Sequence, residues 1–190
     1  MVHRGSPVKS MREFPDRELK WTQPKRLKRY FELLCGDDRI GTLRWEKSFG
    51  SLATAEASEG QWTFKRGGFW GLRVTVRESG SAETIAMFEL SPGGPRTWGT
   101  GSLQYRGGQR IRWAPSGSFW HWLTGHPRCM WVSVNGLEIA GFSYHRGLKT
   151  LDLKTEGRLE VSTHGAGLPE LPLLALLGWY LLTPRYWLFE

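Results

Sequence analysis

The sequence is poor in cysteine, with only Cys35 and Cys129 among its 190 residues. Two cysteines cannot build the disulfide framework that stabilises small secreted domains. Both lie in apolar runs, FELLC and CMWVSV, where a free cysteine serves as a small hydrophobic side chain. The N-terminal stretch also lacks the apolar core of a secretory signal. These absences predict a protein of the reducing cytoplasm.

Catalytic and metal-binding motifs are also missing. The sequence contains no Gly-x-Ser-x-Gly, no P-loop and no His-Glu-x-x-His pattern. His121, His126 and Cys129 are the closest approach to a metal site, but their spacing fits no standard zinc pattern and a fourth ligand is lacking. These residues are better interpreted as two histidines at strand ends and one cysteine in the core than as metal ligands. We therefore expect a protein that is not an enzyme and holds no metal or cofactor.

Only one long hydrophobic run occurs. From Leu171 to Leu182 the sequence LPLLALLGWYLL has no charge, and its only polar side-chain group is the hydroxyl of Tyr180. Glu170 and Arg185 bracket fourteen uncharged residues, which as a helix would span about 21 Å against a bilayer core of about 30 Å. A helix that is apolar all round must be surrounded, either by protein or by lipid. The length favours a buried helix, and the alternative is a tail anchor extended through 186–189.

Proline and glycine set the limits of this helix. Pro172 is tolerated only in a first turn, and Pro184 ends a helix near Thr183. Gly178 lies within the run at a cost of about 1 kcal/mol relative to alanine. We expect a helix over 171–183, with a neighbouring group close to the backbone of Gly178.

The middle of the chain alternates short apolar runs with turn residues. In FWGLRVTVRE, Leu72, Val74 and Val76 share one side, which is the period of a strand with one buried face. Asn135-Gly136 between alternating runs is a strong hairpin signal. The expected strands are Tyr30–Cys35, Arg39–Trp45, Ser51–Ala57, Gln61–Arg66, Phe69–Glu78, Thr84–Leu90, Thr97–Tyr105, Gln109–Ala114, Ser118–Leu123, Cys129–Val134, Leu137–Tyr144, Lys149–Thr155 and Arg158–Ser162.

So many short strands predict a mainly β fold, a closed antiparallel barrel of about twelve strands. Closure hides the edges of a large sheet, and a barrel this wide needs a plug or a ligand inside. The apolar helix is the natural plug, so we place it at the centre of the barrel. Its expected core positions are Leu173, Leu174, Leu176, Leu177, Trp179, Tyr180 and Leu181.

Positive charge is concentrated near the start of the chain. The formal net charge is +8, and residues 1–29 carry nine Lys/Arg against three Asp/Glu. We expect residues 1–27 to form a basic flexible arm and residues 28–190 to form one barrel domain. Six residues could bind an anionic surface: Lys25, Arg26, Lys28, Arg29, Lys65 and Arg66. Such clusters attract anionic lipid, although they also serve as solvated flanks of a hydrophobic strand.

The order of elements resembles a known group. A series of short strands, the hairpin WVSVNGLEIAGF and the terminal helix LPLLALLGWYLL look like the tubby C-terminal-like superfamily, which includes the phospholipid scramblases and the plant LURP-one-related proteins. The resemblance covers 28–190 and implies a twelve-stranded barrel around a hydrophobic C-terminal helix. The acidic calcium-binding segment of scramblases has no counterpart, since GRLEVSTHGAGLPE contains only Glu160 and Glu170.

Three functions fit these patterns. The first is a non-enzymatic, cytoplasmic domain of tubby or scramblase type that binds anionic phospholipid membranes peripherally, or binds a protein partner. The second is a barrel that holds an apolar small molecule beside the helix, and the third is a tail-anchored membrane protein. A near-neutral body and the lack of a nucleic-acid motif argue against DNA or RNA as a partner.

Overall fold

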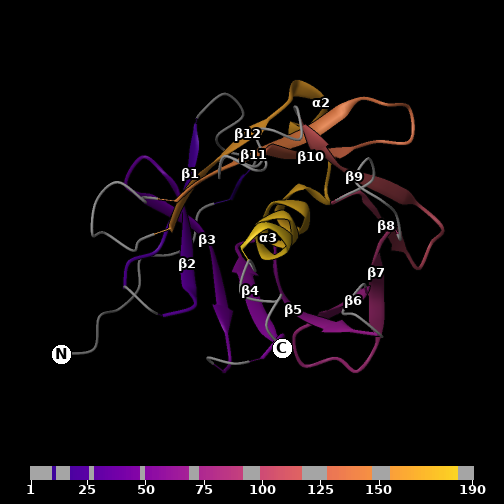
Figure 1. Cartoon of the computed structure of the whole chain (residues 1–190), viewed down its shortest axis with the longest axis horizontal. Coiled ribbons are helices and arrows are strands. Elements are labelled where there is room, and N and C mark those ends of the chain that lie inside the picture. The colour runs from indigo at the N-terminus through magenta and orange to yellow at the C-terminus, as the bar shows by residue number, and fades with distance from the viewer. Residues whose placement is uncertain are drawn as a thin grey trace.

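The computed structural model shows a closed antiparallel barrel of twelve strands with one helix inside it (Figure 1). It describes residues 10–11, 18–25, 28–47, 50–68, 73–91, 99–116, 128–146 and 155–183. The strands are β1 Leu19–Thr22, β2 Tyr30–Cys35, β3 Asp38–Trp45, β4 Ala53–Ala57, β5 Gly60–Gly67, β6 Arg73–Glu78, β7 Thr84–Leu90, β8 Gly101–Tyr105, β9 Arg110–Ser116, β10 Arg128–Val132, β11 Glu138–Arg146 and β12 Thr155–Val161. The predicted fold class is confirmed.

Each strand pairs with the next one along the chain, and β1 closes the barrel by pairing with β12. Leu19 lies opposite Leu159 of β12 on one side and Cys35 of β2 on the other. Every pairing is antiparallel, so the barrel is an up-and-down meander that leaves no open edge.

The strands bury alternate residues, as their period of two requires. In β6, Val74 and Val76 are buried and Arg73 and Arg77 are exposed. In β4 the inward positions are three buried alanines, and α3 packs against this strand as well as against β3, β5, β10 and β11. Small side chains on β4 leave room for the helix to approach.

The central helix α3 extends from Leu171 to Leu182, one residue short of the predicted end. Pro172 lies in its first turn, and Thr183 caps its end by donating its backbone N–H to the Trp179 carbonyl. The predicted core residues are buried, except Leu181, which is half-buried. Gly178 faces the Phe142 ring so closely that a Cβ would lie 2.2 Å from Cζ, so the predicted close neighbour is confirmed.

Aromatic rings join α3 to the barrel wall. Trp179 stacks on Trp21 of β1 with ring centroids 5.1 Å apart, and Tyr180 stacks on Trp45 of β3 at 5.4 Å. Trp131 of β10 donates its indole N–H to the carbonyl of Leu174 over 2.8 Å, a buried hydrogen bond to the first turn of the helix. All six described tryptophans are buried: Trp21, Trp45, Trp62, Trp113, Trp131 and Trp179.

The chain enters the barrel earlier than predicted. β1 and the buried Met11 both lie within residues 1–27, which the charge pattern had suggested as a flexible arm. Met11 joins the core, and its backbone N–H and the Ser10 hydroxyl both donate to the Glu59 carboxylate. The predicted boundary at residue 28 is therefore corrected, because β1 is needed to close the barrel.

The predicted last hairpin, with its turn at Glu156-Gly157, is wrong. Both residues lie within the continuous strand β12. A Cβ on Gly157 would lie 2.3 Å from the Trp179 ring, so this glycine makes space for an aromatic side chain rather than a turn. The predicted strand Ser118–Leu123 and most of Lys149–Thr155 lie outside the described residues, and β9 pairs directly with β10.

The two ends of the barrel differ in their connections. At the end where α3 finishes, here called the Tyr180 end, strands β1, β3, β5, β7, β9 and β11 end and the strand that follows each of them begins. At the other end, here called the Glu170 end, the strand connections are residues 36–37, 58–59, 79–83, 106–109 and 133–137. Longer connections on a rigid scaffold are common places for binding sites.

Candidate functional site

Both predicted basic groups lie at the Tyr180 end. Lys25, Lys28 and Arg29 belong to the connection between β1 and β2, whereas Lys65 and Arg66 are close to the end of β5. Arg26 lies outside the described residues. The fold thus brings together two groups that are about forty positions apart in the chain.

The connection between β1 and β2 is held by a buried glutamine. Gln23 is 9% exposed, and its side-chain amide donates to the Lys28 carbonyl over 2.8 Å. Its side-chain oxygen accepts the backbone N–H of Thr155 over 3.1 Å, which ties the connection to β12. Lys25 and Lys28 are exposed on this fixed segment.

Arg29 joins two connections. Its guanidinium lies over the Trp45 ring, 4.6 Å from the centroid, and donates to the Gly50 carbonyl over 2.8 Å. The cation–π contact and the hydrogen bond fix a half-buried positive charge beside the end of α3. A helix C-terminus favours nearby cations because its free carbonyls carry partial negative charge.

Tyr180 and Arg66 form the inner part of this end. The Tyr180 hydroxyl donates to the Ser51 carbonyl over 2.5 Å, and the Ser51 hydroxyl donates to the Arg66 carbonyl over 3.1 Å. Burial raises the pKa of Tyr180 to about 12, although the nearby positive charge of Arg66 opposes this shift. Burial also lowers the pKa of Arg66. Arg29 and Arg66 therefore have structural roles at the Tyr180 end, because their contacts hold its connections together.

Four lysines remain for contact with a partner. Lys25, Lys28, Lys47 and Lys65 are exposed, and none of them makes an ion pair within the described part of the chain. Sequence reasoning missed Lys47, because a single lysine in EKSFG gives no signal until the strand order places it at the Tyr180 end.

Charge of the opposite sign lies at the Glu170 end. The described turns there carry Asp37, Glu59 and Glu83 against one arginine, Arg106, which pairs with Glu83. The barrel is therefore positive at the Tyr180 end and negative at the Glu170 end.

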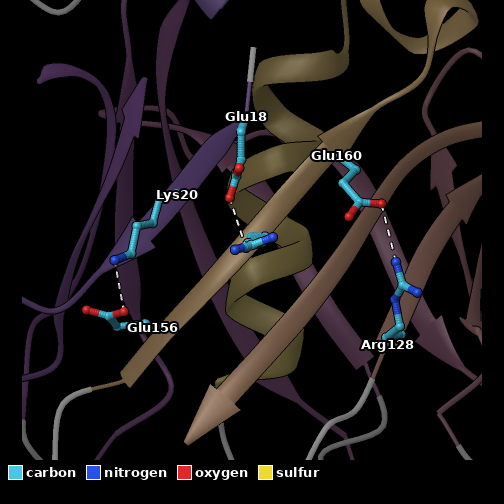
Figure 2. Close-up of polar contacts among 6 residues, drawn as sticks. Glu18, Lys20, Arg128, Glu156 and Glu160 are labelled. Carbon is cyan, nitrogen blue, oxygen red and sulfur yellow. Dashed lines mark hydrogen bonds and ion pairs between the residues drawn. The ribbon is translucent and has the colours of Figure 1, made fainter. Parts of the chain in front are cut away.

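The outer wall around β12 is neutralised by cross-strand ion pairs (Figure 2). Lys20 of β1 lies 2.9 Å from Glu156, and Arg158 lies 2.9 Å from Glu18. Arg128 of β10 reaches Glu160 over 3.3 Å. Exposed pairs of this kind contribute at most about 1 kcal/mol each, but they leave little net charge on this wall.

The Glu170 end holds a second pair of buried polar groups. Burial and the adjacent Glu170 carboxylate raise the pKa of Tyr105. The Tyr105 hydroxyl and one Glu170 oxygen, Oε2, have no hydrogen-bond partner among the described residues. No signal in the sequence pointed to this pair, because Tyr105 resembles any other tyrosine at the end of a strand.

A metal-binding cluster and a membrane-spanning helix are both absent from the described residues. Within the described ranges no three His, Cys, Asp or Glu side chains gather in a way that could hold a metal ion, and His121 and His126 lie outside those ranges. Burial raises the pKa of Cys129 to about 12. Among the described helices, none is long and apolar enough to cross a bilayer.

Comparison of the chain with protein-family models, with curated proteins and with solved structures finds no match.

Proposed function

We propose that this chain is a non-enzymatic, cytoplasmic domain of tubby or scramblase type that binds anionic phospholipid membranes peripherally through the Tyr180 end. The observation that carries this proposal is the group of four exposed lysines at one end of the barrel, Lys25, Lys28, Lys47 and Lys65. The twelve-stranded barrel around a terminal helix supports the superfamily part of the proposal.

The energy of such a contact is sufficient for reversible binding. A lysine near an anionic bilayer contributes about 1 kcal/mol, so four contribute about 4 kcal/mol in low salt. Salt screens these charges over about 10 Å at 0.1 M, so binding should weaken steeply as salt rises.

Nothing among the described residues favours the alternative of an apolar ligand in the barrel. Buried side chains of α3 fill the barrel interior, and Leu174, Leu176 and Leu177 are fully inaccessible to solvent. The helix occupies the space that an apolar molecule would need.

Vesicle co-sedimentation tests the proposal. The full chain should bind phosphatidylcholine vesicles that contain phosphatidylserine, and should bind vesicles of phosphatidylcholine alone much less. The double variant Lys25→Gln/Lys65→Gln should weaken binding by about 30-fold, because it removes about 2 kcal/mol of attraction.

The matched control is Arg110→Gln/Arg112→Gln, which removes the same charge from exposed positions on β9, on the outer wall of the barrel. We expect it to bind nearly as well as the unaltered chain. Equal losses in both variants would mean that only net charge matters, and no binding to acidic vesicles at low salt would overturn the proposal.

A further inference from the structure

We infer that Asn135, at the tip of the β10–β11 hairpin, is a site of spontaneous deamidation, and that local opening of this tip controls the reaction. Asn135 is the only asparagine among the 190 residues, and Gly136 follows it directly. Both residues are exposed. The inference is independent of the proposed membrane function, because this tip lies at the Glu170 end, opposite the exposed lysines.

The chemistry follows from the pairing of an asparagine with a glycine. In base-catalysed deamidation, the backbone nitrogen of the next residue loses its proton and attacks the side-chain carboxamide carbon of asparagine. A new C–N bond closes a succinimide ring, the bond to the side-chain NH2 group breaks, and ammonia leaves. Water then opens the ring at either carbonyl and gives aspartate or isoaspartate. Glycine favours the attack because it has no Cβ and its backbone turns freely.

The tip of this hairpin is exposed, whereas its base is buried. Val134 is 80% exposed and Leu137 is 51% exposed. On either side of the tip, Val132 and Ile139 are 4% and 1% exposed, and the Ile139 carbonyl accepts the backbone N–H of Ser162 over 3.1 Å. The tip can therefore open while the barrel stays closed, as exposed segments do in local unfolding.

Three hydrogen bonds, each involving Ser133, hold the tip in its folded conformation. The Gly136 N–H donates to the Ser133 carbonyl over 3.0 Å, so the nitrogen that must attack is itself hydrogen-bonded. The Ser133 N–H donates to the Leu137 carbonyl over 2.9 Å, and the Ser133 hydroxyl accepts the Leu137 N–H over 3.1 Å. Gly136 has a φ of 79°, the left-handed conformation of the last residue in a three-residue hairpin loop.

The folded hairpin should therefore slow a reaction that its sequence favours. The attacking nitrogen must lose its bond to the Ser133 carbonyl and turn toward the Asn135 side chain, and both changes require the loop to open. Three bonds of ordinary strength lower the population of the open tip at least about tenfold. Each conversion adds a carboxylate to the Glu170 end, which is already acidic.

Peptide mapping by mass spectrometry measures this reaction. The full chain would be incubated at pH 8, either folded or unfolded in guanidinium chloride, and then digested briefly with trypsin. The tryptic peptide 129–146 has no side-chain amide other than that of Asn135, so its conversion to the acid reports this site alone. We expect conversion to be at least about tenfold faster in the unfolded chain. Asn135→Gln should abolish it in both states.

Two variants separate opening of the tip from unfolding of the barrel. Ser133→Ala removes only the bond to the Leu137 N–H, and should speed conversion of the folded chain about 2- to 10-fold without changing the rate in the unfolded chain. Gly157→Ala is the matched control, because it overpacks the wall against Trp179 and leaves the bonds of the tip in place. It should leave the rate in the folded chain unchanged.

Four results would overturn the inference. Equal rates in the folded and unfolded chains, or no effect of Ser133→Ala, would show that the hydrogen bonds of the tip do not protect Asn135. Equal acceleration by Gly157→Ala would assign the reaction to unfolding of the whole barrel. No conversion in the unfolded chain would remove the site. Vesicle binding is measured separately, so none of these results decides the proposed membrane function.

Discussion

Gly157 is a glycine because the Trp179 ring fills the space where a side chain would begin. A Cβ there would lie 2.3 Å from ring atom Cζ3 and 2.6 Å from the Ser143 carbonyl. The ring is held in place by its stack on Trp21, so it cannot easily move away. One missing side chain in the wall thus accommodates the largest side chain of the helix.

Gly157→Ala should therefore destabilise the protein by about 2–3 kcal/mol, the cost of overpacking a well-packed core. Chemical unfolding followed by circular dichroism measures this. Gly67→Ala is the matched control, since it also lies in a strand but has no atom within 4 Å of the added Cβ. We expect the control to change stability by less than about 0.5 kcal/mol. Equal effects would show that the ring contact is unimportant.

The Tyr180 hydroxyl should make stability sensitive to alkaline pH. Burial raises its pKa to about 12 from the ordinary value of 10.0. Above pH 10 the unfolded chain loses this proton and the folded chain keeps it, so the free energy of unfolding falls as pH rises and the loss is complete near pH 12. By pH 11 the expected loss from this group is about 1.4 kcal/mol.

Tyr180→Phe separates this group from the other tyrosines. Because it leaves the Ser51 carbonyl without its donor, it should cost about 1–3 kcal/mol at pH 8. It should also lose less stability than the unaltered protein between pH 9 and pH 11. Unfolding curves at these pH values give both quantities, and parallel losses in the two proteins would contradict the assignment to Tyr180.

α3 behaves as part of the core rather than as a surface helix. Seven large side chains between Leu171 and Tyr180 are buried, and their transfer from water gains about 10–20 kcal/mol. This gross gain is as large as, or larger than, a typical net stability of about 5–15 kcal/mol. The barrel therefore depends on the helix as much as the helix depends on the barrel.

A chain that ends before Leu168 should fail to fold, because the barrel loses its filling and exposes its inner face. A chain that ends after Thr183 keeps every described contact of α3 and should stay folded. Circular dichroism and size-exclusion chromatography distinguish these outcomes. A folded, monomeric chain lacking α3 would show that the helix is dispensable.

Individual elements differ in how much their sequences reveal. α3 was predicted to within one residue because a run without any polar face is rare and prolines mark both of its limits. β1 was missed because four residues, LKWT, show too little alternation to stand out in a basic segment. Glu156-Gly157 looked like a turn because the sequence cannot show that a tryptophan ring, twenty-two positions later, needs the glycine's empty space.

The closed barrel could be predicted from the sequence, but the end of the barrel at which each connection and the start of α3 lie could not. Many short strands and one helix that must be surrounded are enough to predict a closed sheet with a plug. The end at which a connection lies depends on counting every strand correctly. Splitting β12 at Glu156-Gly157 would add one strand and reverse the direction of the chain after it, so α3 would start from the wrong end of the barrel.

The order of elements along the chain also constrains how the protein is made. β1 pairs with β12, and α3 follows β12, so all twelve strands leave the ribosome before the helix that fills them. At about 5–20 residues per second, the nascent chain spends roughly 10–30 s with strands but no core. During this interval the alanine and aromatic side chains that will face the barrel interior are exposed and can contact other chains. The protein should therefore complete its folding only after α3 has been synthesised, and should need chaperone protection until then.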